Sequence, residues 1–154
     1  MTQYVVVEHD GPLLRLRLSR PELHNAFDDV LIGELTTALD QAGADPAVRV
    51  VVLEAEGKSF SAGADLAWMR RMAAASEADN RADALALARL MRTLDSLPRP
   101  TIARVQGPAL GGGAGLVACC DIAIGTPAAR FAFSEARLGL LPAVISPYVV
   151  AAIG

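Results

Sequence analysis

A run of three glycines, Gly111 to Gly113, lies between a β-rich segment and an apolar segment that we expect to be helical. Glycine lets a strand turn sharply into a closely packed helix, so the run has a purely structural interpretation. The functional interpretation is that a helix N-terminus without side chains offers free N–H groups to an oxygen that becomes negatively charged. The run does not have the Gly-x-Gly-x-x-Gly spacing that a dinucleotide site requires.

A second turn rich in small residues occupies positions 60–66 and reads Phe-Ser-Ala-Gly-Ala-Asp-Leu. Its simplest interpretation is a helix start, because Asp65 precedes a helical pattern and aspartate is a favoured N-cap. Two such turns that each open a helix could, however, direct one backbone N–H apiece to the same point, which is how an oxyanion hole is built. The residues alone leave both interpretations open.

Glu135 is the third candidate for chemistry, and it lies just beyond a predicted short strand. Carboxylates are seldom buried, so a lone glutamate is usually a solvated surface residue. In an apolar pocket the same carboxyl group could exchange protons with carbon or with water.

The composition favours a single domain with a large core. The 154 residues fit one domain, since single hydrophobic cores commonly serve about 100 to 200 residues. Apolar residues make up 53% of the chain and the mean hydropathy is +0.36, which favours a large core or a surface covered by partners. The net charge is −3 and Lys and Arg are dispersed, which argues against nucleic-acid binding.

The sequence predicts no metal site and no membrane segment. Cys119 and Cys120 are neighbours in an apolar run, so we expect small buried side chains rather than a disulfide or metal ligands. The most apolar stretch, residues 114–124, is interrupted by Asp121 and is shorter than the roughly 20 residues of a membrane helix. Residues 1–10 contain no basic stretch followed by an apolar run, so we expect a cytoplasmic location.

Strand and helix signals alternate along the chain, which predicts an α/β fold. Residues 4–7 and 13–18 alternate around an Asp-Gly-Pro turn and predict a β-hairpin. Residues 48–53 form an almost continuous run of Val and Leu, which is typical of a strand buried on both faces. Further short strands are predicted at residues 101–105, 122–124 and 130–133.

Polar residues placed before helical patterns predict where the helices begin. Asp28, Asp65 and Ser76 are expected N-caps. Ser146 is expected to be the N-cap of a final helix, with Pro147 in its first turn. The glycine run should lead into a helix over residues 114–120.

Taken together, these segments resemble the enoyl-CoA hydratase/isomerase, or crotonase, family. The resemblance extends from about Tyr4 to Gly154, and the matching motifs occur in the family's order and spacing. They are Arg20-Pro21-Glu22, Asn25-Ala26-Phe27, residues 60–66, residues 105–113, Cys120-Asp121-Ile122-Ala123 and residues 131–142.

The resemblance implies an α/β fold of the ClpP/crotonase type, which is a spiral of ββα turns. Residues 1–154 would form one catalytic core, the N-terminal part of the family domain. The C-terminal helical region, which normally completes the coenzyme A site and the trimer contacts, would be absent. Similar proteins form homo-trimers or hexamers, act on acyl-CoA thioesters, and need no metal and no cofactor besides the coenzyme A of the substrate.

The resemblance also assigns site residues. The backbone N–H groups of Ala64 and Gly112 would form the oxyanion hole, and Glu135 would be the catalytic acid/base. Together with these two donors, four further residues are expected to line the coenzyme A channel: Ala26, Ala62, Asp65 and Leu66.

One position departs from the family pattern and bears on the reaction. Hydratases of the family commonly carry a first glutamate where this chain has Gly115, so Glu135 is expected to act alone. Hydration of an enoyl-CoA double bond is the first hypothesis. Isomerisation of the double bond between C2 and C4, or acyl-CoA binding without catalysis, are the alternatives.

A narrower resemblance concerns the substrate. Residues 112–121 and 141–148 look most like hydratases of branched glutaconyl-CoA thioesters (methylglutaconyl-CoA or isohexenylglutaconyl-CoA), which act in leucine or acyclic-terpene breakdown. Such substrates carry a distal carboxylate. Glycine at 115 removes a negative charge and is expected to leave space, which would suit that carboxylate.

Overall fold

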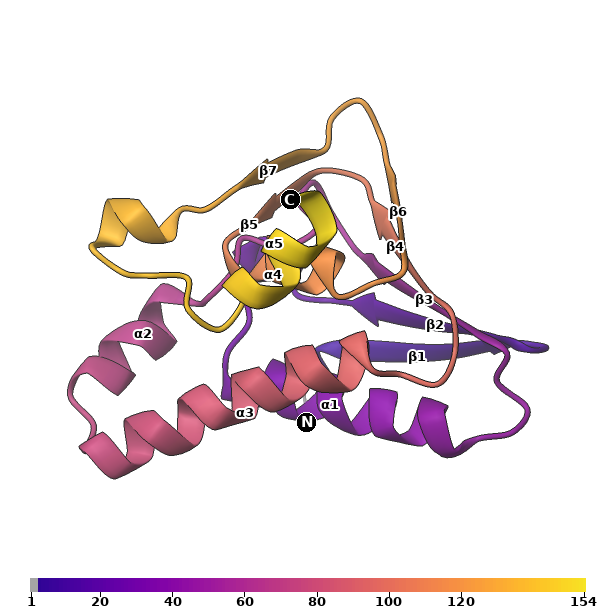
Figure 1. Cartoon of the computed structure of the whole chain (residues 1–154), viewed down its shortest axis with the longest axis horizontal. Helices are drawn as coiled ribbons and strands as arrows, with labels where there is room; N and C mark the ends of the chain where they lie inside the picture. Colours follow the sequence, from indigo (N-terminus) through magenta and orange to yellow (C-terminus); the bar gives the residue numbers. More distant parts are fainter. Residues whose placement is uncertain (1–2) are drawn as a thin grey trace.

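The computed structural model describes residues 3–154, and its centre is a five-stranded mixed sheet in the order β1-β2-β3-β4-β6 (Figure 1). The predicted hairpin is confirmed, and the later strands add to it in parallel. β3 is buried at its four central residues, as its Val and Leu run predicts. The strands are β1 (Val5–Asp10), β2 (Leu13–Leu18), β3 (Val50–Ala55), β4 (Thr101–Val105) and β6 (Ile122–Gly125).

Two long helices, α1 (Asp29–Ala44) and α3 (Glu77–Asp95), lie side by side along one face of this sheet (Figure 1). Three leucines at alternate positions of β2 point inward, as expected for a strand with one apolar face, and join the leucines of α1 in one core. None of them is more than 2% exposed: Leu14, Leu16 and Leu18 on β2, and Leu31, Leu35 and Leu39 on α1.

Three predicted N-caps are confirmed. The Asp28 carboxylate accepts from two N–H groups at the start of α1, and Ser76 Oγ accepts from the Asp79 N–H of α3. Asp65 accepts from the N–H groups of Ala67 and Trp68 and so begins α2 (Leu66–Ala73). These side chains satisfy backbone donors that have no partner within the helix.

A second, smaller sheet pairs β5 (Pro108–Leu110) with β7 (Arg130–Ala132) in parallel. β5 was not predicted, because three residues that begin with proline show no strand periodicity. Its other edge is bridged to the 60–66 turn, where Ser61 pairs with Ala109. The glycine run follows β5 directly and opens α4 (Gly112–Ala118).

Two predicted helix starts need correction. α4 begins at Gly112 rather than at residue 114, because the glycines themselves adopt helical geometry. α5 (Ser146–Ile153) includes Ser146 as its first residue, so the prediction that Ser146 is the N-cap was wrong. Its hydroxyl instead donates to the Pro142 carbonyl oxygen at 2.6 Å, and no side chain caps this helix.

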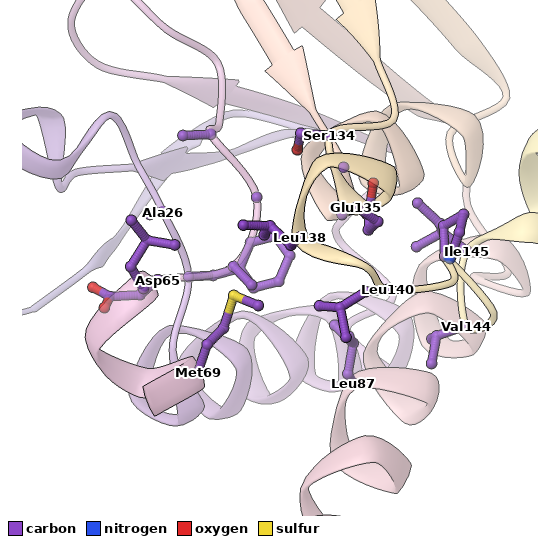
Figure 2. Close-up of a pocket in the computed structure, with 18 of the residues that line it drawn as sticks. Ala26, Asp65, Met69, Leu87, Ser134, Glu135, Leu138, Leu140, Val144 and Ile145 are labelled. Carbon is purple, nitrogen blue, oxygen red and sulfur yellow. The ribbon is translucent and has the colours of Figure 1, made fainter. Parts of the chain in front are cut away.

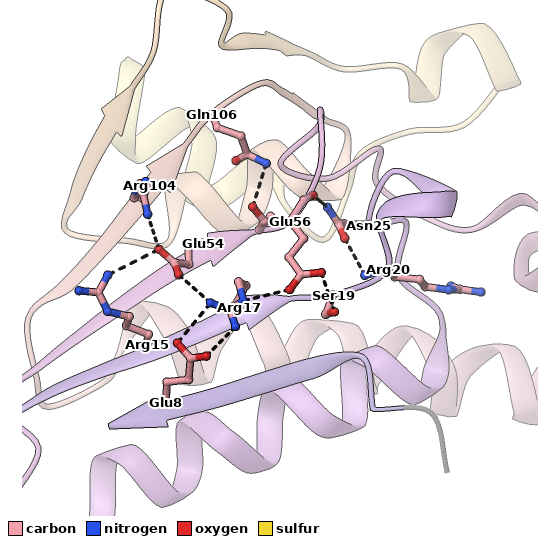
Figure 3. Close-up of polar contacts among 11 residues, drawn as sticks. Glu8, Arg15, Arg17, Ser19, Arg20, Asn25, Glu54, Glu56, Arg104 and Gln106 are labelled. Carbon is pink, nitrogen blue, oxygen red and sulfur yellow. Dashed lines mark hydrogen bonds and ion pairs between the residues drawn. The ribbon is translucent and has the colours of Figure 1, made fainter. Parts of the chain in front are cut away.

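The face of the sheet away from α1 and α3 carries charged side chains (Figure 3). Glu54 on β3 is only 6% exposed, and it forms ion pairs with three arginines of the neighbouring strands. The contact distances are 3.8 Å to Arg15, 3.7 Å to Arg17 and 2.9 Å to Arg104. Pairing of this kind compensates for the desolvation of the buried carboxylate.

Both cysteines are free thiols, and Cys119 is buried as predicted. Burial raises the pKa of Cys120 to about 12, so its thiol stays protonated at neutral pH. Within residues 3–154, no group of His, Cys, Asp and Glu is arranged to hold a metal ion. In the same part of the chain, each helix is too short or too polar to cross a bilayer.

Gly107, in the turn between β4 and β5, tests the packing that brings the second sheet against the 60–66 turn. A Cβ at this position would lie 2.0 Å from the Lys58 carbonyl oxygen, which is backbone and cannot rotate away. We expect Gly107→Ala to lower the free energy of unfolding by about 1 to 3 kcal/mol, measured by urea denaturation with circular dichroism.

The matched control is Gly33→Ala in the exposed part of α1, where no atom lies within 4 Å of the new Cβ. This change should raise the free energy of unfolding by about 0.5 to 1 kcal/mol, because alanine loses less entropy than glycine in a helix. Equal stability of the two variants would contradict the close packing at Gly107.

Candidate functional site

A cavity of about 800 Å³ opens beside the second sheet (Figure 2). Its walls come from the segment before α1, the 60–66 turn with α2, the start of α4, and the chain from Ser134 to Ile145. Most of the lining side chains are apolar, including Met69, Leu87, Leu140 and Val144. A mostly apolar concave site with few polar groups is the usual form of a small-molecule site.

Backbone hydrogen bonds hold the four wall segments side by side. Phe27 donates to the Gly63 carbonyl at 2.9 Å and accepts from the Asp65 N–H at 3.0 Å, on either side of Ala64. Leu110 donates to the Ser61 carbonyl at 2.9 Å, and Gly111 donates to the Ala132 carbonyl at 2.8 Å. The ends of these segments therefore meet at one edge, and the cavity lies there.

The N–H groups of Ala64 and Gly112 both belong to the cavity wall, and within residues 3–154 neither donates a hydrogen bond to a protein atom. The two turns touch, because a Cβ placed on Gly63 would lie 3.4 Å from the Gly112 nitrogen. Both donors are therefore available to an oxygen atom of a ligand or of water in the cavity.

Close contacts explain why the turn must consist of glycines. A Cβ on Gly112 would lie 2.2 Å from Phe27 Cζ, and one on Gly113 would lie 2.7 Å from the Ser61 carbonyl oxygen. Gly111 has φ +53°, which side chains other than glycine rarely tolerate. The structural interpretation of the run is therefore correct, and it is compatible with the functional one, since the Gly112 N–H has no acceptor among residues 3–154.

Glu135 lies at the start of the short helix η2 (Glu135–Leu138), just after β7, and its side chain enters the cavity (Figure 2). Its Oε1 would lie 2.7 Å from a Cβ on Gly111, so the carboxyl group faces the glycine turn. Its Oε2 is buried and has no hydrogen-bond partner among the described residues. Such an oxygen is available to a ligand or to water.

The other two carboxyl groups of the cavity wall are differently placed. Asp65 is occupied by its cap bonds and by Arg20 at 3.0 Å. Burial raises the pKa of Asp65, but the backbone N–H bonds and Arg20 outweigh it, so the pKa lies below its usual value. Glu22 is exposed on the short helix η1 (Pro21–Leu23). Glu135 is thus the one wall carboxyl group of residues 3–154 that is both partly buried and unpaired.

The expectation that Gly115 leaves space was wrong. Gly115 is buried, and a Cβ there would lie 2.4 Å from Ile145 Cγ2 and 2.9 Å from Ile145 Cβ. The side chain of Ile145, which is 3% exposed, therefore fills the volume that a larger residue at 115 would need. The sequence did not reveal this contact, because Ile145 is 30 residues away and on another element.

All the predicted site residues line this one cavity: Ala26, Ala62, Ala64, Asp65, Leu66, Gly112 and Glu135. Their roles toward a ligand stay predictions. The motifs did not include Met69 of α2 or Leu87 of α3, which contribute to the apolar side of the cavity. These residues are ordinary apolar side chains, so only tertiary structure identifies them.

Comparison with known proteins supports one family. The enoyl-CoA hydratase/isomerase family matches residues 8–154. A crystal structure of an enoyl-CoA hydratase from Shewanella pealeana is 48% identical with a TM-score of 0.96, and the match covers 99% of this chain and 57% of that one. The fold class expected from the sequence is therefore confirmed.

Two curated relatives are also similar. An enoyl-CoA hydratase of Alternaria alternata is 38% identical over 147 residues, which is 96% of this chain and 47% of the relative. A crotonyl-CoA hydratase of Syntrophomonas wolfei is 34% identical over 139 residues, which is 90% of this chain and 52% of the relative. The chain thus spans about half the length of these relatives.

Proposed function

The chain belongs to the enoyl-CoA hydratase/isomerase family, and on this premise we propose that it adds water across the α,β double bond of an enoyl-CoA thioester. The observation that carries the proposal is the meeting of two unpaired N–H groups, from Ala64 and Gly112, with the unpaired carboxyl group of Glu135 in one apolar cavity. The names of the relatives, enoyl-CoA and crotonyl-CoA hydratase, support the same reaction.

The proposed oxyanion hole stabilises charge that develops during the reaction. The thioester carbonyl oxygen accepts hydrogen bonds from Ala64 and Gly112, and these bonds strengthen as the oxygen becomes that of an enolate. Each donor is worth about 3 to 4 kcal/mol of activation free energy, as for other oxyanion holes. The Gly112 N–H adds the positive end of the α4 helix dipole.

The acid/base step uses one side chain. Glu135 takes a proton from a water molecule, the water oxygen bonds to Cβ, and the electron pair of the double bond moves to the enolate. The protonated Glu135 then returns its proton to Cα, which restores the carboxylate and completes the hydration. The wall segments at Ala26, Ala62, Asp65 and Leu66 are proposed to hold the coenzyme A part of the substrate.

Replacing Glu135 tests the acid/base assignment. We expect Glu135→Gln to lower kcat by about 10² to 10⁴-fold, because the amide cannot take a proton from water, while binding of the acyl-CoA changes little. Hydration of crotonyl-CoA is followed by loss of the enoyl absorbance, and binding is followed by calorimetry.

Glu22→Gln is the matched control, since Glu22 is another carboxyl group of the same cavity wall but is exposed. It should keep the wild-type kcat. Full activity of Glu135→Gln would remove Glu135 from the mechanism. Acyl-CoA binding without turnover in the wild-type chain would instead favour the non-catalytic alternative.

Double-bond isomerisation is the second candidate, and one observation favours it. A single free carboxyl group in the cavity is sufficient to carry a proton between C2 and C4 of the same thioester. In water enriched in ¹⁸O, hydration should place one labelled oxygen in the 3-hydroxyacyl product, detected by mass spectrometry. An enoyl product that carries no label and has its double bond at a new position would indicate isomerisation instead.

The branched glutaconyl substrate is the finer part of the proposal. Arg137 lies two residues after Glu135, lines the cavity and has no ion pair among the described residues, so it is a candidate partner for a distal carboxylate. We expect Arg137→Leu to reduce kcat/KM for a 3-methylglutaconyl-CoA more than for crotonyl-CoA.

Arg70→Leu is the matched control, because Arg70 is also an exposed arginine of the cavity wall without an ion pair in the described structure. It should change kcat/KM for both thioesters by the same factor. An equal loss with both substrates in Arg137→Leu would contradict the carboxylate contact.

The trimeric or hexameric assembly and the cytoplasmic location stay predictions. Two apolar side chains at alternate positions of β6 are exposed, Ile122 at 51% and Ile124 at 58%. Exposed apolar side chains close together are a usual feature of surfaces that partners cover.

A further inference from the structure

Arg20 is an arginine that lies outside the cavity wall and is nearly buried, at 8% exposure. Its guanidinium contacts three groups: Asp28 at 3.1 Å, Asp65 at 3.0 Å and the Ala26 carbonyl oxygen at 2.9 Å. The ring of Tyr4 lies 4.8 Å from the guanidinium carbon. A desolvated guanidinium is costly unless its donors are paired, and here the paired groups come from two separate parts of the chain, residues 26–28 and Asp65.

The two carboxylates each serve a helix as well. Asp28 and Asp65 use one oxygen, Oδ1, to cap α1 and α2, and they use the other, Oδ2, to bind Arg20. One planar side chain therefore joins the starts of both helices. Without it, two negative side chains that are 13% and 9% exposed would face a desolvated space with no counter-charge between them.

The third contact of Arg20, with the Ala26 carbonyl oxygen, connects it to the proposed oxyanion hole. Ala26 is followed by Phe27, which forms backbone hydrogen bonds to Gly63 and Asp65 and so encloses Ala64. Arg20 thus holds the backbone on one side of Ala64 through Ala26 and on the other side through Asp65. On both sides, the guanidinium is linked to the Ala64 N–H only by covalent bonds, hydrogen bonds and the ion pair with Asp65.

The loop over residues 20–25 has a strained backbone and is closed by two hydrogen bonds between Arg20 and Asn25. His24 and Asn25 both have φ +52°, in the left-handed region that is unfavourable for residues other than glycine. The Arg20 N–H donates to Asn25 Oδ1 at 2.8 Å, and the Asn25 N–H donates to the Arg20 carbonyl oxygen at 2.9 Å. Strain of this kind persists only where surrounding contacts enforce it.

We infer that Arg20 is a positioning residue for the reaction: it sets the direction of the Ala64 N–H by clamping Asp65 and Ala26 on either side of it. The inference rests on the proposed function of Ala64 as an oxyanion donor. Arg20 does not touch the substrate, since it is not part of the cavity wall.

Arg20→Gln and Arg20→Lys test the inference in the full 154-residue chain. Glutamine removes the charge, and lysine keeps the charge but cannot reach three acceptors in one plane. We expect Arg20→Gln to lower kcat about 100-fold with little change in KM, since a donor displaced by about 1 Å can cost that factor. Arg20→Lys should give an intermediate kcat, and all rates are measured well below the unfolding temperature of each variant.

A second readout does not depend on hydration. A 3-oxoacyl-CoA forms an enolate that absorbs in the near ultraviolet, and a working oxyanion hole favours the bound enolate. The wild-type chain should show this absorbance, and Arg20→Gln should lose most of it at saturating ligand. If the wild type shows the absorbance but no hydration, the hydratase proposal fails while the positioning role is still tested by Arg20→Gln.

Arg17→Gln is the matched control, because Arg17 also pairs with several carboxylates, namely Glu8, Glu54 and Glu56, but on the far face of the sheet (Figure 3). It should keep both kcat and the enolate absorbance. Wild-type kcat and absorbance in Arg20→Gln would overturn the inference. The inference would also be overturned if kcat and the enolate absorbance of Arg20→Gln fell only in proportion to its folded fraction, measured by circular dichroism. If Arg20→Gln does not fold, Arg20→Lys decides by the same two readouts.

Discussion

The site depends on one constraint, the parallel pairing of β5 with a segment on each of its edges. Ser61, Ala109 and Phe131 lie in one row across this small sheet. Because the three segments run in parallel, residues that lie the same number of positions after this row reach the same edge of the small sheet. Three residues beyond the row are Ala64, Gly112 and Ser134, and Glu135 follows directly. The register of three short segments therefore brings two N–H groups and one carboxyl group to a single cavity.

Polar groups around the cavity divide into paired ones that hold the structure and unpaired ones that face the ligand space. Asp65 is fully engaged, since one oxygen caps α2 and the other binds Arg20. Glu135 Oε2 and the N–H groups of Ala64 and Gly112 have no partner in residues 3–154. Leaving the buried Glu135 Oε2 unpaired costs free energy, which the surrounding core must offset. Strain at His24 and Asn25 lies in the same region and adds to this cost.

The sequence predicted the parts of this fold that depend on local chemistry. Asp28, Asp65 and Ser76 were identified as caps because capping needs only a polar side chain next to a helical pattern. β5 was missed because it is a strand only through its partners, the 60–66 turn and β7, and has no periodicity of its own. The contact of Ile145 with Gly115 was missed for the same reason, since long-range packing leaves no mark on local spacing. The two small-residue turns and Glu135 were identified from residue types, their roles were assigned through resemblance to a family, and the structure adds wall residues outside every motif, such as Met69 and Leu87.

The proposed oxyanion hole consists of backbone amides, which limits how substitutions can change it. No substitution at Ala64 removes its N–H except proline, so side-chain variation alters the hole only by moving the backbone. The residues that control its position are those that leave room, such as Gly112 against Phe27, and those that clamp the turn, such as Arg20. The proposed proton transfer, in contrast, depends on one replaceable side chain, Glu135, which lies in the apolar wall. In the proposed mechanism, stabilisation of the enolate oxygen and transfer of the proton to carbon are thus assigned to separate parts of the chain, so the second can vary while the first is kept.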